Sequence, residues 1–135
     1  MKASRTLKLI VALMLMVFIV SLCGCIIYNY VPNRVLKQYD LNDEKIPAKV
    51  SDEDFSDDMV IVILKRSPTK YKPTVSDFAF YNIGHIRYLS ENSERCFLFV
   101  YLKYKGKDKV LEAVKYFDSL SIVYHVSPNE YIPYA

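Results

Sequence analysis

The stretch Met59-Val60-Ile61-Val62-Ile63-Leu64 is an unbroken apolar run, rich in β-branched residues, that ends at Lys65. Such a run predicts a β-strand that is apolar on both faces. A second run, Cys96-Phe97-Leu98-Phe99-Val100-Tyr101-Leu102, has the same character. A strand has both faces covered best at the centre of a sheet, so we expect these two strands to be the central ones.

Two weaker strand patterns flank these runs. Residues 83–89 predict one strand and residues 122–126 another, which Ser127-Pro128-Asn129 is expected to stop. Residues 108–119 place apolar side chains at a helical period behind Asp108, a good N-cap, and predict an amphipathic helix.

The segment 74–80 predicts a short helical turn capped by Thr74 or Ser76. The expected order is therefore βαββαβ. This order predicts an α+β fold with a ferredoxin-like antiparallel sheet and both helices on one face. The other face of the central strands is then apolar and open, which marks a partner site or an oligomer interface. The alternative is that the segment 26–57 or the C-terminal tail folds over that face.

The N-terminus predicts export. Lys2, Arg5 and Lys8 precede an uncharged apolar run from Leu9 to Leu22, which is the layout of a signal segment. The positive residues favour the cytoplasmic side, so the chain that follows is expected outside the cell membrane.

The next residues, Leu22-Cys23-Gly24-Cys25, resemble the lipobox of bacterial lipoproteins. The resemblance assigns lipidation to Cys25, because small Gly24 precedes it whereas bulky Leu22 precedes Cys23. An uncleaved single-pass anchor remains open, since Leu9 to Ile27 is nineteen residues and about 20 are needed to span a bilayer. Plain secretion is the third possibility. All three place residues 31–135 on the extracytoplasmic side, and the first two hold them at the membrane.

The sequence divides into three parts. Residues 1–25 are the signal peptide or membrane anchor, and residues 58–135 are the folded domain. Residues 26–57 contain Pro32, Pro47 and the acids Asp52, Glu53, Asp54 and Asp57 with weak periodicity, which predicts an acidic flexible spacer.

Composition argues against catalysis and cofactors. The chain has three glycines, so no glycine-rich phosphate loop is available, and its net charge of +3 carries no polybasic arm for nucleic acid. The two histidines, His85 and His125, fit neither a nucleophile context nor zinc spacing. Cys96 is expected to be a small buried hydrophobe. We therefore expect no enzyme activity, no metal and no cofactor.

From Asp57 onward the sequence resembles the propeptide or inhibitor domain of subtilisin-like serine proteases, and more closely the stand-alone versions found in bacterial surface proteins. Four pieces carry the resemblance in order: residues 57–64, residues 74–78, residues 109–114 and residues 123–132.

The resemblance implies a protein-binding module that serves as an inhibitor or folding chaperone of a subtilisin-like protease. The open sheet face would dock on the protease, and the tail would enter the cleft as an added strand. The tail residues that would bind are Tyr131, Ile132, Tyr134 and Ala135. Pro133 departs from this picture because it lacks a backbone N–H. The alternative is a non-inhibitory surface lipoprotein that binds an envelope partner or itself.

Overall fold

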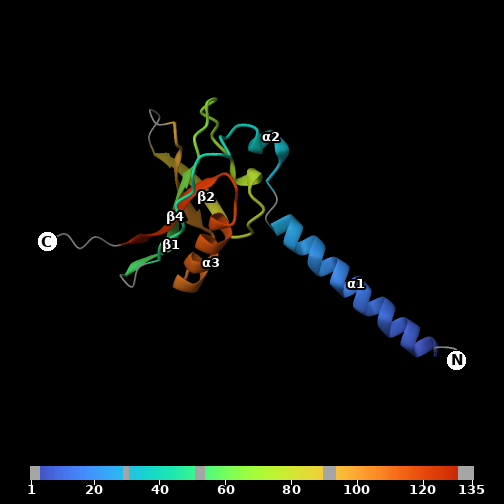
Figure 1. Ribbon diagram of the computed structural model, residues 1–135. Coiled ribbons are helices and arrows are strands. Elements are labelled where there is room, and N and C mark those ends of the chain that lie inside the picture. Colours follow the sequence, from blue (N-terminus) through green and yellow to red (C-terminus); the bar gives the residue numbers. More distant parts are fainter. Residues whose placement is uncertain (1–3, 29–30, 51–53, 90–93, 131–135) are drawn as a thin grey trace.

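A four-stranded antiparallel sheet organises the chain (Figure 1). The computed structural model describes residues 4–28, 31–50, 54–89 and 94–130, the side chains of residues 22–28 excepted. The strands are β1 (Phe55–Leu64), β2 (Ile83–Leu89), β3 (Phe97–Leu102) and β4 (Val123–Glu130). The helices are α1 (Arg5–Tyr28), α2 (Asn33–Leu36), the 3₁₀ turn η1 (Val75–Asp77) and α3 (Lys107–Asp118).

The strand order is β2-β3-β1-β4, and every neighbouring pair is antiparallel. The expected α+β class with an antiparallel sheet is confirmed. The two strands that are apolar on both faces, β1 and β3, occupy the centre, as their composition predicted.

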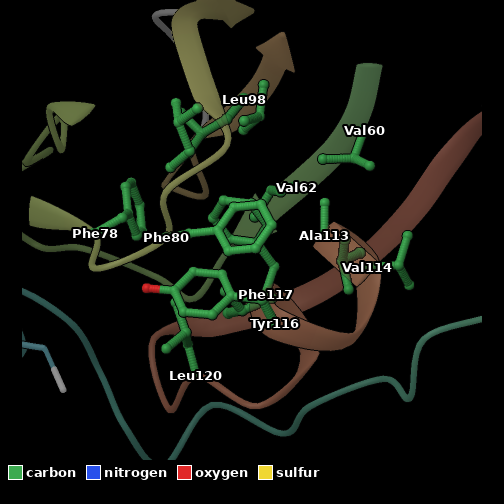
Figure 2. Packing of buried hydrophobic residues seen from close by; sticks show 14 of the residues in the cluster. Val60, Val62, Phe78, Phe80, Leu98, Ala113, Val114, Tyr116, Phe117 and Leu120 are labelled. Carbon is green, nitrogen blue, oxygen red and sulfur yellow. The ribbon is translucent and has the colours of Figure 1, made fainter. Parts of the chain in front are cut away.

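Helix α3 covers one side of the sheet. Its apolar stripe is buried against β1 and β4, and Figure 2 shows Ala113 directed toward Val60 and Val62. Phe80 stacks on Tyr116 with ring centroids 4.8 Å apart, and Phe78 meets Phe117 edge-on at 5.3 Å.

The predicted helix 108–119 is confirmed almost to its ends, but its cap is not Asp108. Gly106 occupies the N-cap position with φ 141°, a conformation that side chains rarely adopt. A substitution here would be strained by this φ, whereas the nearest atom, an Asp108 carboxylate oxygen 2.6 Å from a Cβ, ends a flexible side chain and can shift. Asp108 instead lies in the first turn, where a negative charge favours the helix dipole.

The expected helical turn over 74–80 is only the three-residue turn η1. Thr74 does begin it, since the Thr74 N–H donates to the Asp77 carboxylate at 2.9 Å. Beyond it the chain is not helical: Phe78 and Phe80 are both buried while Ala79 between them is exposed. Two aromatic rings two residues apart reach one core only from an extended backbone. Core packing therefore overrides the local helical pattern.

Residues 31–48, which belong to the segment expected to be a flexible spacer, pack on the domain instead. Val31, Val35 and Tyr39 are buried in the same core cluster as Val60 and the rest of the helix-covered side. Backbone bonds fix the segment: the Asp40 N–H donates to the Arg66 carbonyl at 2.8 Å, and the Ile46 N–H to the Tyr124 carbonyl at 2.9 Å. Val31, Val35 and Tyr39 recur every four residues and bury apolar surface, which the acidic composition of the segment does not lead one to expect.

Strand β4 also runs further than predicted, through Pro128 to Glu130. Pro128 lies opposite Val60, next to a register shift in the β1–β4 pairing. Because β4 is an edge strand, a residue without an N–H is tolerated there.

Helix α1 extends away from the rest of the chain (Figure 1). Its apolar side chains are exposed on all sides, among them Leu13, Met16 and Phe18. Within the described residues, no helix is both long enough and apolar enough to cross a bilayer.

A candidate docking face of the sheet

The side of the sheet opposite α3 carries a second set of apolar side chains, which we call the open face. The alternation of β1 and β3 creates it: Val60, Val62 and Leu64 point toward α3 and are fully buried, so the residues between them point the other way. The register places the members of the open face beside one another: Met59, Ile61 and Ile63; Phe97, Phe99 and Tyr101; His85, Arg87 and Leu89; His125 and Ser127.

These residues form rows across the strands. In the middle row, Arg87 of β2, Phe99 of β3, Ile61 of β1 and Ser127 of β4 lie side by side. Ile61 and Phe99 are only half-buried, whereas their chain neighbours on the other side are fully buried. Neither residue belongs to the core cluster or to the hydrophobic residues packed against it. The centre of the open face is thus apolar surface outside the core.

The rim of the open face is polar and basic. His85 is exposed and stacks on Tyr101, with ring centroids 4.4 Å apart and 8° between the planes. Arg87 is exposed next to Phe99. On the other edge, His125 Nδ1 lies 3.3 Å from the Ile46 carbonyl oxygen. No aspartate or glutamate stands among the paired residues that define this face. An apolar centre with the Arg87 guanidinium at its edge suits a partner that carries apolar groups and a carboxylate.

Two buried carboxylates join segments that are far apart in the sequence. Asp43 accepts from Arg95 at 2.8 Å and from Arg66 at 3.3 Å, and the hydrogen bond from Arg95 lowers the pKa of Asp43 to about 2. This ion cluster fixes the segment before β1 to the ends of β1 and β3.

The second carboxylate, Asp77, joins η1 to α2. Burial raises its pKa, but hydrogen bonds from the Thr74 N–H, the Tyr71 hydroxyl and Arg34 outweigh burial, so the pKa is lowered overall. The partners of Asp77 all belong to segments of the fold that pack beside it. Neither Asp43 nor Asp77 is placed to act as a general acid or base.

The two histidines and Cys96 are not arranged for acid, base or nucleophilic chemistry. His85 and His125 lie on opposite edge strands. Cys96 is half-buried, and burial raises the pKa of its thiol, which disfavours the reactive thiolate. Among the described residues, no three side chains of the His, Cys, Asp and Glu types gather as a metal site would require.

The predicted site residues at the chain ends are not described. The backbone of Cys25 lies in α1, and its side chain is outside the described part. Tyr131, Ile132, Tyr134 and Ala135 follow β4 and lie outside the described residues.

The sequence predicted an apolar open face but did not identify its members. The signal was available in β2, where polar His85 and Arg87 alternate with Ile86 and Tyr88 and so mark the solvent side. The arginine partners of Asp43 and Asp77 were missed because those ion pairs join residues more than twenty positions apart.

No family model, no curated protein and no solved structure matches this chain.

Proposed function

We propose that this protein is a non-enzymatic protein-binding module, tethered on the outer side of the cytoplasmic membrane, that docks through its open face. The observation that carries the proposal is the pair Ile61 and Phe99, apolar residues at the centre of the sheet that lie outside the core. Apolar surface gathered in this way marks an interaction site. The tether is the segment before Val31, and lipidation of Cys25 is its proposed form.

The proposed fold class is ferredoxin-like. The order β2-β3-β1-β4 supports it, because a split βαβ arrangement places the first and third strands at the centre. The departure lies in the first crossover, which has η1 where a regular helix is expected. Residues 31–40, held by Val35 and Tyr39, fill that part of the core instead.

The proposed partner class is a subtilisin-like serine protease, which the sequence resemblance implies. Two features support it. The open face offers the docking surface, and β4 is an edge strand that leads directly into the tail Tyr131, Ile132, Tyr134 and Ala135. Such a tail can add a strand to a cleft.

The size of the open face favours this partner over self-association. Four strands about 4.8 Å apart and three rows about 6.7 Å apart give a flat area of roughly 400 Å². A standard interface buries about 800 Å² on each partner, so the face alone is too small for a stable dimer. A partner that also binds the tail makes up the difference.

The test is inhibition of a panel of subtilisin-like proteases by residues 31–135, a segment that contains every residue of the core cluster. We expect inhibition by this segment, and loss of inhibition when residues 131–135 are deleted or Phe99 is changed to Ser. Leu111→Ser is the matched control, because Leu111 is exposed on α3, across the sheet from the open face. Inhibition by none of the proteases, with the segment shown to be folded, would refute the protease partner.

The alternative is a surface lipoprotein that binds an envelope partner or itself. Sedimentation velocity of the same segment separates the two readings. A dimer that Phe99→Ser abolishes and Leu111→Ser preserves would establish self-association through the open face.

A further inference from the structure

The two edges of the sheet differ in how far they are closed. β2 and β4 are the edge strands, and each has an outer side that faces away from the sheet. Residues alternate along an antiparallel strand: one exchanges both of its backbone hydrogen bonds with the neighbouring strand, and the next directs its N–H and C=O the other way. One backbone hydrogen bond and the register therefore fix which residues face outward.

On β2 the outward residues are Ile86 and Tyr88. The Leu64 N–H donates to the Cys96 carbonyl directly opposite it at 2.9 Å, so the even-numbered residues of β1 and β3 bond to each other. The odd-numbered residues of β3 therefore bond to the odd-numbered residues of β2 that lie opposite them. Ile86 and Tyr88 are left with N–H and C=O groups that point outward. No backbone hydrogen bond from the described part of the chain reaches these groups.

The outer edge of β4 is closed by two features. The β4 residues opposite even-numbered positions of β1, among them Val126 and Pro128, face outward. Pro128 has no N–H to donate. Next to them, the Tyr124 carbonyl already accepts from the Ile46 N–H at 2.9 Å. β2 is therefore the edge at which the fold can accept another strand.

The outer edge of β2 continues the open face. His85 and Arg87, both exposed, are the members of the open face on β2. A strand added to β2 would lie about 4.8 Å beyond it and would extend each row of the open face by one residue. In the middle row that residue would stand beside Arg87, in line with Phe99 and Ile61. One partner can thus cover the open face and bind the edge.

Arg87 determines the chemistry that suits an added strand. Its guanidinium is exposed, and no carboxylate of the described residues pairs with it. An antiparallel strand would form its hydrogen-bonded pairs with Ile86 and Tyr88, so Arg87 would belong to the non-hydrogen-bonded pair between them, where side chains lie closer. An aspartate or glutamate opposite Arg87 would be attracted, and a like charge would be repelled.

The same position disfavours a second copy of β2. Pairing that uses both outward residues of each copy sets Ile86 opposite Tyr88 of the other copy, and it sets Arg87 opposite its own counterpart. Two guanidinium groups directly opposite each other destabilise such a pair. The edge therefore suits an acidic segment of another protein better than a second copy of this chain.

We infer that the outer edge of β2 binds an extended segment of the partner protein as a fifth, antiparallel strand, with an acidic residue of that segment opposite Arg87. This inference rests on the proposed function, because the segment belongs to the protein that docks on the open face. Main-chain hydrogen bonds to Ile86 and Tyr88 attach the segment, and the charge of Arg87 selects it.

The experiment titrates the full protein, labelled with ¹⁵N and held in detergent micelles, with two synthetic peptides. Each is a blocked peptide of alternating threonine and valine, nine residues long, with glutamate at the centre of one and lysine at the centre of the other. Amide hydrogen exchange, followed by NMR, reports on each residue. The Arg87 amide, which already bonds to β3, and the Val126 amide at the other edge are the internal controls.

We expect the glutamate peptide to slow exchange of the Ile86 and Tyr88 amides several-fold and to leave both control amides unchanged. It should bind several-fold more tightly than the lysine peptide. Arg87→Glu should reverse this preference. Lys115→Glu makes the same change of charge at an exposed position on α3 and should leave the preference as it is.

Two results would overturn the inference. Unchanged exchange of the Ile86 and Tyr88 amides at saturating peptide would show that the edge accepts no strand. Protection of these amides with equal affinity for the two peptides would show that Arg87 selects nothing. Neither result bears on docking by the open face, because the inhibition panel and Phe99→Ser measure that separately.

Discussion

Val62 and Ile61 are neighbours in β1 whose side chains point to opposite sides of the sheet. Val62 is fully buried between Leu98 and Val126, which are also fully buried. Ile61 is half-buried between Phe99 and Ser127 on the open face. The same substitution at the two positions therefore separates the core from the proposed docking surface.

Val62→Asp should unfold the domain. Losing the buried valine costs about 1.5 to 3 kcal/mol. A carboxylate in an apolar interior has its pKa raised by up to about 3 to 5 units. At neutral pH this adds a cost of about 4 kcal/mol, which is the free energy of protonating the aspartate at that pH. The total is comparable to the whole stability of a domain of about 100 residues, about 5 to 15 kcal/mol and at the low end for so small a core.

Ile61→Asp should leave the domain folded, because its carboxylate stays in contact with water. We expect a loss of about 1 to 2 kcal/mol from partial burial and strand propensity. Urea unfolding followed by circular dichroism, on residues 31–135 of both variants, measures the difference. A cooperative transition for Val62→Asp close to that of the parent would refute this assignment of faces. Loss of the transition for Ile61→Asp would show that the open face is part of the core.

Three further predictions follow from the chain ends and the ion clusters. Cys25→Ala should abolish acyl labelling and shift the size of the membrane form, and unchanged labelling and size would rule out lipidation at Cys25. The pKa of Asp43 is lowered to about 2 in the folded state, so Asp43 stabilises the fold above the ordinary aspartate pKa, and this stabilisation is lost as the pH falls toward 2. After discounting for the partly exposed arginines, the stabilisation is roughly 1 to 2 kcal/mol. Asp43→Asn should therefore flatten the acid limb of a stability–pH curve. Pro133→Ala should strengthen protease inhibition, because it restores a backbone donor worth about 0.5 to 1.5 kcal/mol, and weaker inhibition would argue against strand pairing by the tail.

The sequence predicted the central strands because their composition is unambiguous. The runs around Val62 and Val100 are apolar at every position, which only a central strand accommodates, and the 3.6-residue period placed α3 within one residue at each end. The prediction from sequence failed where tertiary contacts override the local pattern. Phe78 and Phe80 need an extended backbone to reach Tyr116 and Phe117, so the helical turn stops early.

The segment before β1 was misjudged for a related reason. Its proline and acid content predicts disorder, yet Val35 is fully buried and Asp43 is held by Arg95, a residue fifty-two positions away. No local pattern reports such a pairing. The sequence predicted that an open face exists. The uniform apolar run in β1 does not show which of Ile61 and Val62 faces the solvent, and only their burial in the fold distinguishes them.

Site-specific photo-crosslinking in the producing cell tests the central claim, that the open face is the docking surface. A photoreactive phenylalanine replaces Phe99 in one strain and Leu111 in the other, with the full chain at its native location. We predict one discrete protein adduct from position 99, lost in the Ile61→Asp background, and none from position 111. An open face that gives no adduct, or the same adducts from both positions, would contradict the account.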